Sequence, residues 1–482
     1  MFIDISYSRG HETTIPGSLM QKVNITINIP DEVRKTIFKI INKFHDNGFE
    51  CYLIGGSVRD FIMGNEVYDY DFATNARPEQ MMKLFRKTIP TGIKHGTISV
   101  LADSHQFEIT TYRSDGRYID GRHPDSVSFA QELRIDVERR DFTINGLVYD
   151  FQTGEVIDYV NGLSDIEHKI IRTIGDPIAR FSEDGLRAVR ACRFAAKLNF
   201  DIELNTFRAI PETLETVKKV SKERIRDELL KILESEKPSV GFEYLRRSGL
   251  LDLFLPELAE CYGVLQNKYH IYDVYYHSIY SCDAAPKDNM AVRLAALFHD
   301  IGKVATKQPN ASGDFTFYNH EVLGVRITKK IMRRLKFSNE QIDGVSNLIL
   351  NHMFHYTDEW TDGAVRRFIR KAGLENIDDL FLLRMADRKG NGARKGLPHP
   401  IGRFKERIRR VLEAENAFSV RDLNINGNVI MDELGLKPGP IIGKILNELL
   451  ELVLDNPELN ERQKLAGEAR RILERHKTES SV

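Results

Sequence analysis

Residues 51–74, CYLIGGSVRDFIMGNEVYDYDFAT, hold the pattern from which the rest of the chain can be interpreted. An apolar run ends at Ile54 and leads into Gly55 and Gly56, which predicts a strand, a glycine turn and then a helix that opens at Ser57. Such a turn can point several backbone N–H groups into one concavity that favours an anion such as a triphosphate. Gly-Gly turns are common, so a purely structural role is the alternative.

Two acidic residues, Asp69 and Asp71, follow in a segment whose composition suits a short strand or a strand entry. At i and i+2 on a strand their side chains would share a face, and both carboxylates could bind the same pair of divalent ions. Two ions roughly 4 Å apart would activate an attacking hydroxyl and neutralise a departing pyrophosphate. Glu108, in an apolar strand pattern, is the candidate third ligand. A turn or a solvated acidic pair is the alternative for the aspartates.

The composition of the whole chain bounds its class. Its 482 residues correspond to about three domains. Lys and Arg number 69 and Asp and Glu 70, so a globally basic surface is excluded, although local basic faces are not. Hydrophobic residues at 41% and charged residues at 29% argue against extensive disorder. We expect a soluble globular protein.

Targeting and redox signals are weak. The four cysteines are far apart and form no CxxC pair, which fits a reducing compartment. The first residues, MFIDISYSRGHETT, lack the apolar run of a secretory signal, and no segment approaches about 18 uninterrupted apolar residues. We therefore expect a cytoplasmic protein with no membrane partner.

Further along the chain, the pattern predicts an α+β region followed by a helical one. Residues 31–47 show helical apolar spacing, and short β-rich pieces follow. From Asp176 on, the pattern is almost wholly helical. The predicted segments are an N-terminal arm over 1–30, a head over 31–155, a helical neck and body over 156–268, a further helical domain over 269–400 and a helical tail over 401–482.

The spacing of Gly55-Gly56-x-x-Arg59-Asp60 and Asp69-x-Asp71-x-x-Thr74 resembles the signature of class II tRNA nucleotidyltransferases (CCA-adding enzymes) and bacterial poly(A) polymerases. Further motifs of that family follow in order, for ribose recognition at 139–145, a hinge at 158–172, base selection at 183–187 and a helix turn at 221–225. The resemblance implies a DNA polymerase β-like nucleotidyltransferase head, an all-α neck and body, and Mg²⁺ held by Asp69 and Asp71. The nucleotide-binding residues that it implies are Gly55, Gly56, Arg59, Arg140, Asp141, Asn145, Asp184, Arg187, Arg190 and Arg193.

The base-selecting motif has a chemical logic of its own. Asp184 and Arg187 lie three apart in residues 181–193, which we interpret as one helix, so both would share a face. A carboxylate only accepts hydrogen bonds and a guanidinium only donates them. That pair matches the amino donor and ring-nitrogen acceptor of cytosine and adenine, and uracil and guanine present the reverse. Arg190 and Arg193 continue the row and could hold phosphates. Ion pairs on a solvated helix are the alternative.

Other features of the chain leave two interpretations open. One of the arginines at 139 and 140 could simply pair with Asp136 or Glu138. Gly185, where the family often has Pro, should loosen the local turn. Residues 113–124 resemble the flexible loop of full CCA-adding enzymes, or form an ordinary surface loop. Basic residues over 384–410 predict a phosphate track for tRNA, or a solvated face.

A second chemical cluster lies in the helical part of the chain. Its members, in chain order, are His277, His299, Asp300, His320, His352 and Asp387. This ordered series resembles the HD phosphohydrolase superfamily, so the α-helical region 269–400 is predicted to be an HD domain. Imidazole and carboxylate ligands suit a transition ion such as manganese, nickel or iron. Packed or surface histidines are the alternative. The resemblance implies one metal held by His277, His299, Asp300 and Asp387, with His320 and His352 extending the site to a second.

We therefore expect template-independent addition of C, C and A to the 3′ end of tRNA from CTP and ATP. The terminal 3′-hydroxyl would attack the α-phosphate with Mg²⁺ bound, and the HD domain could add phosphohydrolase activity. A poly(A) polymerase or A-adding enzyme is the close alternative. An HD phosphohydrolase with a non-catalytic RNA-binding head is an alternative from another class, and a non-catalytic RNA-binding protein is a third. The oligomeric state stays open.

Overall fold

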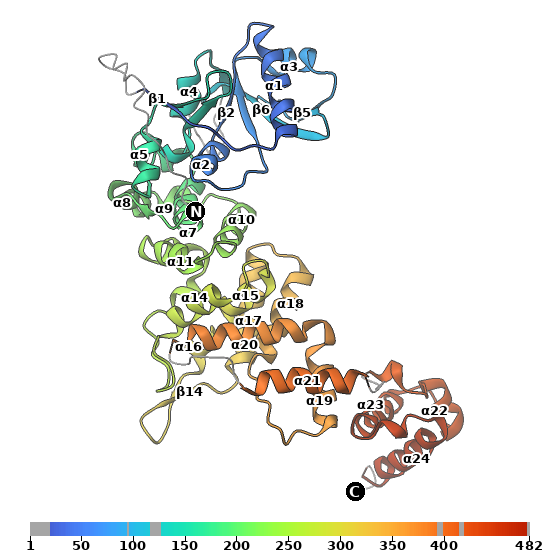
Figure 1. Ribbon diagram of the computed structural model, residues 1–482. Coiled ribbons are helices and arrows are strands. Elements are labelled where there is room, and N and C mark those ends of the chain that lie inside the picture. The colour runs from blue at the N-terminus through green and yellow to red at the C-terminus, as the bar shows by residue number, and fades with distance from the viewer. Residues whose placement is uncertain (1–19, 94–95, 116–126, 393–398, 414–418, 480–482) are drawn as a thin grey trace. The chain divides into compact units, whose positions relative to one another are not determined.

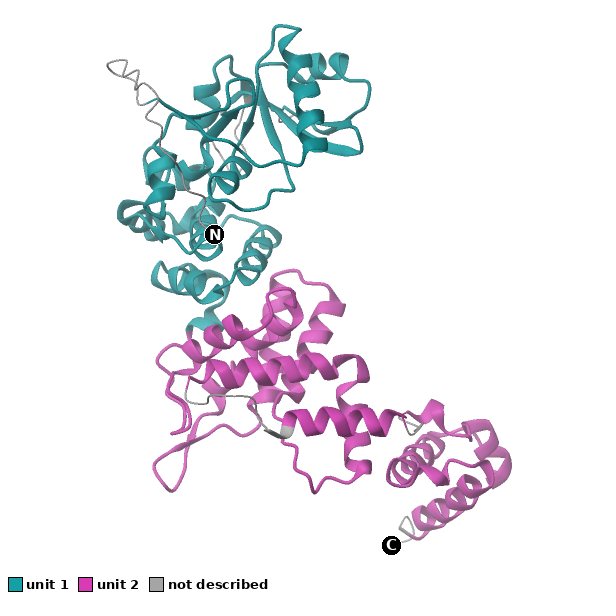
Figure 2. Ribbon diagram, in the orientation of Figure 1, with its two compact units in different colours: residues 1–259 teal, residues 260–482 magenta. Residues whose placement is uncertain are grey.

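The computed structural model describes residues 20–93, 96–115, 127–392, 399–413 and 419–479 (Figure 1). The chain divides into two compact units, Met1–Ala259 and Glu260–Val482 (Figure 2). Each unit is described by itself below.

The first unit is built on an eight-stranded sheet with the order β1-β10-β9-β2-β3-β6-β5-β4. Within this sheet β3 and β6 run parallel, and the other neighbours run antiparallel. Its strands are β1 (Gln21–Asn24), β2 (Cys51–Ile54), β3 (Asp71–Thr74), β4 (Thr88–Gly92), β5 (Thr97–Ala102), β6 (His105–Thr111), β9 (Leu147–Asp150) and β10 (Glu155–Asp158). Two small sheets pair β7 (Arg113–Asp115) with β8 (Val127–Phe129) and β11 (Ile170–Ile171) with β12 (Asp201–Ile202).

Helices surround this sheet and, together with the β11–β12 pair, make up the rest of the unit (Figure 1). Those of the sheet region are α1 (Asp31–His45), α2 (Gly56–Ile62), α3 (Pro78–Leu84), α4 (Leu133–Glu138), the 3-10 turn η2 (Thr143–Asn145) and α5 (Gly162–Glu167). The following helices are α6 (Pro177–Glu183), α7 (Leu186–Leu198), α8 (Leu204–Glu212), α9 (Leu214–Val217), α10 (Lys222–Leu233), α11 (Pro238–Arg247), α12 (Leu250–Phe254) and α13 (Pro256–Ala259).

Apolar clusters cover both faces of the large sheet because side chains alternate along a strand. Leu53 and Phe72 pack with residues of α1 on one face. Their neighbours Ile54 and Ala73 pack with α4 on the other face. A residue's parity along β2 or β3 therefore decides which face it occupies, and the polar residues of the α4 side build the site described below.

Over the part of the second unit that the structure describes, the chain is helical apart from one short β pair (Figure 1). Around its first core lie α14 (Val274–Ala284), α15 (Met290–Phe298), α16 (Lys303–Thr306), β13 (Gln308–Pro309), β14 (Phe315–Thr316), α17 (His320–Arg334), α18 (Asn339–Asn351), α19 (Asp362–Ala372), η3 (Leu374–Asn376), α20 (Ile377–Gly390) and α21 (His399–Glu413). A separate apolar cluster holds η4 (Val420–Asp422), α22 (Gly427–Leu434), α23 (Pro440–Asp455), η5 (Pro457–Leu459) and α24 (Arg462–Glu479).

The predicted α+β architecture with a helical remainder is confirmed. The helix predicted over 31–47 is α1, and the run before the glycine turn is β2. The division of the chain at Ala259 lies close to the border predicted at 268, and the finer segment borders stay predictions. Among the described residues, no helix is both long and apolar enough to cross a membrane.

Candidate active sites

Three acidic side chains meet on the α4 side of the large sheet. Asp71 opens β3 and lies in register with Glu108 on the parallel strand β6. Their neighbours Phe72 and Ile109 belong to the core on the α1 side, so both carboxylates project from the opposite face. Burial raises the pKa of Asp71 to about 6, and the charges of Asp69 and Glu108 add to that rise. Asp69 and Glu108 thus lie within electrostatic reach of Asp71.

The glycine turn lies beside these carboxylates. Strand β2 runs antiparallel to β3 with Leu53 opposite Phe72, so the residues after Ile54 continue toward Asp71. Gly55 has φ +86°, and a Cβ there would lie 3.2 Å from Nη1 of Arg140, whose guanidinium therefore covers the turn. The same guanidinium partly offsets the rise in the pKa of Asp71. The Arg140 guanidinium, the glycine turn and the acidic cluster around Asp71 are therefore neighbours.

Arg139 and Arg140 both pair with Asp136, a buried residue of α4. The distances from the guanidinium nitrogens to its carboxylate oxygens are 2.7 and 3.1 Å. The alternative considered for one of these arginines, a simple ion pair with Asp136, is therefore observed for both. Although burial raises the pKa of Asp136, the two guanidiniums lower it overall, so Asp136 stays ionised and orients both cations.

Asn145 joins the glycine turn to the ribose motif. Its side chain accepts from Nη1 of Arg59 at 2.5 Å and donates to Asp141 at 3.1 Å. Asp141 in turn accepts from Nε and Nη2 of Arg190 at 2.8 and 2.5 Å. Arg59 is only 2% exposed and also pairs with Asp60, so its guanidinium here positions Asn145 from inside the protein. Its contact with triphosphate stays a prediction.

Arg190 controls the charge of Asp141. Burial by itself raises the pKa of this carboxyl, but the Arg190 guanidinium and the Asn145 amide outweigh it and lower the pKa to about 2. Asp141 is therefore an acceptor at neutral pH, as a ribose-binding role requires.

The prediction that residues 181–193 form one helix is wrong. The helix breaks at Asp184, so that α6 ends at Glu183 and α7 begins at Leu186. Asp184 has extended backbone angles (φ −140°, ψ 107°), and its carboxylate accepts from the backbone N–H of Leu186 at 3.0 Å. At the next residue, Gly185, a Cβ would lie 2.7 Å from backbone atoms of Val217. Gly185 thus packs tightly against Val217, and the expectation that it loosens the turn stays a prediction.

Asp184 and Arg187 consequently have different partners. Asp184 accepts from Nη2 of Arg224 on α10 at 2.7 Å. Arg187 pairs with Glu183 and donates to the carbonyl of Arg139 at 3.2 Å. Among the described residues, no ion pair joins Asp184 to Arg187. The break still places both at the start of α7, and their base-selecting role stays a prediction.

Arg193 lies deeper than a phosphate-binding residue of a solvated helix would. Its Nε is 3.0 Å from Oε2 of Glu228, and its guanidinium lies 3.9 Å from the ring centre of Phe194. Burial lowers the pKa of Arg193 to about 10, and the positive charge of Arg190 adds to that effect.

Three residues have supporting roles that the sequence interpretation did not predict in full. Asp136 was expected to pair with one arginine only, and the roles of Glu228 and Arg224 were not predicted. Asp136 and Glu228 are buried acids on helices, and Arg224 is a basic residue within the helix-turn motif. Their partners are three to forty residues away in the chain. For Asp136 and Glu228, the one available signal is an acidic residue on the buried side of a helix. By itself this signal is weak.

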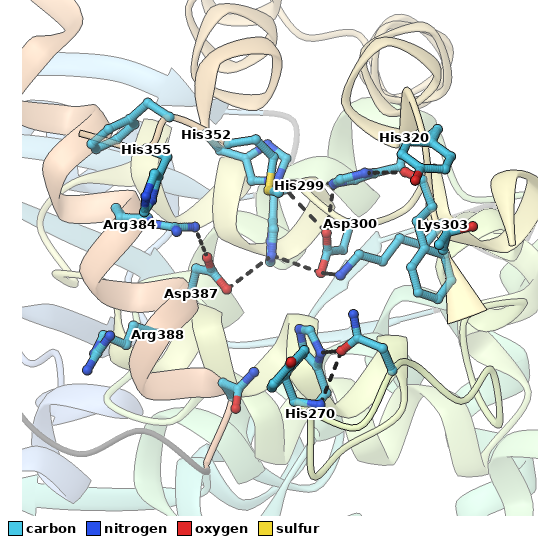
Figure 3. Close-up of a pocket in the computed structure, with 18 of the residues that line it drawn as sticks. His270, His299, Asp300, Lys303, His320, His352, His355, Arg384, Asp387 and Arg388 are labelled. Atoms are coloured by element: carbon cyan, nitrogen blue, oxygen red, sulfur yellow. Dashed lines mark hydrogen bonds and ion pairs between the residues drawn. The ribbon is translucent and has the colours of Figure 1, made fainter. Parts of the chain in front are cut away.

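The predicted HD residues converge in the second unit. Figure 3 labels His299, Asp300, His320, His352 and Asp387 of this group. Asp300 lies at the centre, with Oδ2 at 3.2 Å from Nε2 of both His277 and His299. Its other oxygen, Oδ1, is 3.4 Å from Nε2 of His320 and 3.9 Å from that of His352. The carboxylate therefore bridges two groups of nitrogen donors, each compact enough to hold a cation.

Asp387 of α20 completes the first group. Its Oδ1 is 3.3 Å from Nε2 of His277 and 3.9 Å from that of His299. Burial raises the pKa of Asp387, but the hydrogen bond from His277 and the nearby imidazoles hold it well below its usual range. Arg384 binds the second oxygen of Asp387 at 3.0 Å and fixes the carboxylate.

Backbone carbonyls orient three of the imidazoles. Nδ1 of His299, His320 and His352 lies 2.8, 2.8 and 2.6 Å from the carbonyls of Ala296, Phe317 and Ile349. With the proton on Nδ1, each Nε2 presents its lone pair to the cluster, which is the usual orientation of a metal-binding histidine. The donor set fits a transition ion, and the ligation itself stays a prediction.

A cavity of about 810 Å³ opens at this cluster. Lys303 lies between Asp300 and Gln266, with Nζ at 2.6 and 2.7 Å from their oxygens. Cationic and aromatic side chains complete the lining. They include His270, Phe317, Tyr318, Arg384, Arg388 and Phe404.

Two further expectations meet the structure only in part. In the predicted basic track, Arg403, Lys405, Arg407 and Arg409 are each held by a carboxylate of the second unit. Arg394 and Lys395 lie outside the described residues, as does most of the segment 113–124 that resembles the flexible loop.

Comparison with known families fits this geometry. Residues 51–172 match the poly A polymerase head domain, residues 199–262 the probable RNA and SrmB-binding site of polymerase A, and residues 268–391 the HD domain. The sheet with its carboxylates and glycine turn thus belongs to a nucleotidyltransferase with an appended HD domain.

The chain belongs to the CCA-adding enzyme family. It is 32% identical to the CCA-adding enzyme of Ligilactobacillus salivarius over 93% of this chain and 99% of that protein. It is 33% identical to the one of Lactococcus lactis subsp. cremoris over 91% and 96%. The solved CCA-adding enzyme of Bacillus stearothermophilus in complex with CTP has a TM-score of 0.72 and 26% identity, with 94% of this chain and all of that one covered. The Thermotoga maritima enzyme complexed with tRNA has a TM-score of 0.56 at 19% identity, which supports the fold alone.

Proposed function

We propose that this protein adds C, C and A to the 3′ end of tRNA, in the cytoplasm, from CTP and ATP. The convergence of Asp69, Asp71 and Glu108 beside the Gly55 turn and Arg140 is the observation that carries the proposal. Oxygen donors from carboxylates are the ligands that Mg²⁺ prefers, so the donor set fits this ion. When bound there, Mg²⁺ would supply the charge that activates the terminal hydroxyl and stabilises the leaving pyrophosphate.

The chain's own residues orient the nucleotide. Arg140, covering the glycine turn, is in position to hold the triphosphate. Asp141, ionised and fixed by Arg190, can accept hydrogen bonds from ribose hydroxyls. Asp184 and Arg187 offer an acceptor and a donor for the base edge, and their present partners Arg224 and Glu183 hold them in reach of the start of α7.

The test uses tRNA that lacks its 3′ tail, incubated with the pure protein, Mg²⁺ and each nucleoside triphosphate in turn. We expect incorporation of C and A, with U and G slower by at least about two orders of magnitude because the wrong base leaves polar groups unpaired. Addition should stop after three nucleotides. A long A tail would instead identify a poly(A) polymerase, and equal use of all four nucleotides would remove the base-selection proposal.

We also propose that the HD cluster is a second, metal-dependent phosphohydrolase centre. Its support is the bridging position of Asp300 between two sets of imidazole nitrogens that are already oriented by backbone carbonyls. A manganese, nickel or iron ion held there would polarise a phosphoryl oxygen and lower the pKa of a bound water. Lys303, Arg384 and Arg388 make the cavity suitable for an anion.

Hydrolysis of a phosphomonoester such as p-nitrophenyl phosphate, with Mn²⁺, Ni²⁺ or Fe²⁺ added in turn, tests this second activity. Asp300→Asn should abolish it and leave nucleotide addition unchanged, whereas Asp71→Asn should have the opposite effect. If Asp300→Asn hydrolyses the ester at the wild-type rate, the cluster is not the hydrolytic centre.

A further inference from the structure

The Arg59 guanidinium is a buried cation with polar partners on two sides. Its Nη1 donates to Oδ1 of Asn145 at 2.5 Å. Its Nε and Nη2 both lie 2.8 Å from Oδ1 of Asp60, the next residue of α2. Neighbouring residues of a helix do not face each other, so the Arg59 side chain has to bend toward this carboxylate. Asp60 and Asn145 therefore hold the guanidinium between them.

These contacts decide which way the Asn145 amide faces. Its oxygen accepts from Arg59, and its nitrogen donates to Oδ1 of Asp141 at 3.1 Å. The reversed amide would set N–H groups against the guanidinium and an oxygen against the carboxylate, and both hydrogen bonds would be lost. Within the described part of the chain, Asp141 is the one acceptor for this NH₂ group. Its second N–H is therefore left for a ligand.

A single aromatic ring supports both guanidiniums that flank the Asp141–Asn145 pair. The centre of the Phe194 ring is 5.3 Å from the guanidinium carbon of Arg59 and 5.3 Å from that of Arg190. Cations are attracted to the face of an aromatic ring. Arg190 binds Oδ2 of Asp141, so the pair is held at both ends by cations that pack on the same buried ring.

The outer end of this chain of contacts is at the protein surface. Oδ2 of Asp60 is 3.8 Å from Nζ of Lys197, whose side chain is 50% exposed. Ion pairs of this kind contribute little because water screens them. The shorter contacts of Asp60 are those with Arg59, so the carboxylate acts mainly on the buried guanidinium.

We propose that Asp60 is a positioning residue for the ribose of the incoming nucleotide. It holds Arg59, and Arg59 turns the amide of Asn145 so that one N–H binds Asp141 and the other faces the 2′-hydroxyl. A hydroxyl donates and accepts, which suits a carboxylate beside an amide N–H, and a deoxyribose has no group there. The inference rests on the nucleotidyl transfer proposed above and makes Asp60 a determinant of ribonucleotide over deoxyribonucleotide selection.

The test measures the Kd of CTP and of 2′-deoxyCTP by calorimetry, with Mg²⁺ and without tRNA, so that no turnover occurs. For the full-length wild-type protein we expect CTP to bind at least about tenfold more tightly, because the deoxynucleotide leaves polar groups unpaired. Asp60→Ala should weaken CTP binding about fivefold and leave the deoxynucleotide within about twofold, since one directed hydrogen bond is lost. Asp60→Asn should change the preference in the same direction, and Asp60→Glu, which keeps a carboxylate, should restore most of it.

Lys197→Met is the matched control. It removes the surface partner of Asp60 and leaves Arg59 held, so both Kd values should match those of the wild type.

A double variant tests whether the effect passes through Asn145. Asn145→Ala removes the amide that Arg59 orients and should lower the preference for CTP. Asp60→Ala added to Asn145→Ala should lower that preference no further, because the two residues act in one chain of contacts.

Equal weakening of CTP and of the deoxynucleotide by Asp60→Ala would reject a role in ribose recognition, since a general loss of structure affects both. Additive effects of Asp60→Ala and Asn145→Ala would reject transmission through the amide. A wild-type protein that binds both nucleotides equally would reject selection at the 2′-hydroxyl. Failure to add C to tRNA would instead contradict the proposed transferase activity, and the Kd values would still decide the role of Asp60.

Discussion

The proposed nucleotidyl transfer depends on the negatively charged carboxylate of Asp71. Asp71→Asn keeps the shape of the side chain but removes the charge that, with Asp69 and Glu108, makes the donor set. We expect the single-turnover rate of C addition to fall at least about a thousandfold, with tRNA affinity unchanged. Asp103→Asn, in the turn between β5 and β6, is the control and should keep the wild-type rate. A variant of Asp71 that works normally would contradict the metal-binding assignment.

The Asp141 carboxylate should make the first unit sensitive to acid. Its pKa is about 2 in the folded protein against an ordinary value of 3.8. Because the folded pKa is lowered, its contribution of about 2 kcal/mol is complete well above pH 4 and is lost as the pH falls from about 4 to 2. We expect Asp141→Asn to lower the free energy of unfolding by about this amount at pH 7. The difference should shrink to about half at pH 3 in urea titrations, and a pH-independent difference would refute the linkage.

For single residues, the sequence predicts which residue types form the site better than it predicts which residues they bind. Asp69 and Asp71 are predicted as ligands from their i, i+2 spacing on a strand, and Glu108 from its place in an apolar strand. Strand β3 begins only at Asp71, so Asp69 lies before it, and the register places Asp71 opposite Glu108. Metal binding by the three stays a prediction. The sequence suggested Asp136 as a partner of one arginine, and the structure shows that it binds both. The sequence did not reveal that Arg224 binds Asp184, because the two residues are forty positions apart. Long-range pairing depends on tertiary packing, which spacing alone does not encode.

Among the elements, α10 supports the start of α7 through one ion pair. Arg224→Met would free Asp184 from its partner at 2.7 Å and let the carboxylate turn away from the incoming base. We expect the ratio of kcat/KM for CTP over UTP to fall about tenfold, because rejection of uracil depends on a fixed acceptor. Arg226→Met, on the same helix but paired with its neighbour Asp227, should leave the ratio unchanged. The prediction fails if both variants discriminate as the wild type does.

The approach of α16 to α17 depends on a glycine. A Cβ at Gly302 would lie 2.8 Å from the backbone nitrogen of Gly324 and collide with the carbonyl of His320. Gly302→Ala should therefore destabilise the second unit by about 1–3 kcal/mol in thermal melts and weaken metal binding at His320. Gly344→Ala, on α18, meets nothing within 4 Å and should be neutral or stabilising by up to about 1 kcal/mol. Equal effects of the two substitutions would contradict the packing argument.

Elements with regular apolar spacing, such as α1 and β2, were predictable, whereas the break between α6 and α7 was not. Residues 181–193 have helical spacing throughout, yet the extended backbone of Asp184 interrupts the helix. The sequence alone does not distinguish a glycine that allows a close approach of two backbone segments from a glycine that makes a turn more flexible.

For the whole molecule, the division into two compact units predicts two separable responses to ligands. Each unit has its own apolar cores, so calorimetry should resolve two transitions. A ligand that binds one folded unit raises the stability of that unit alone, by about 2.7 kcal/mol at a hundred times its Kd. We expect Mn²⁺ to raise the Tm of one transition, and CTP with Mg²⁺ to raise the other.

Variants at the two sites assign these transitions. Asp300→Asn should abolish the Mn²⁺ shift and keep the CTP shift, because the bridging carboxylate is lost and the sheet face is untouched. Asp71→Asn should keep the Mn²⁺ shift and weaken the CTP shift, which depends on Mg²⁺ at the sheet. Removal of Mn²⁺ with EDTA should return the wild type to its starting Tm. If either variant moves both transitions equally, the two centres are thermodynamically coupled and the assignment of one site to each unit is wrong.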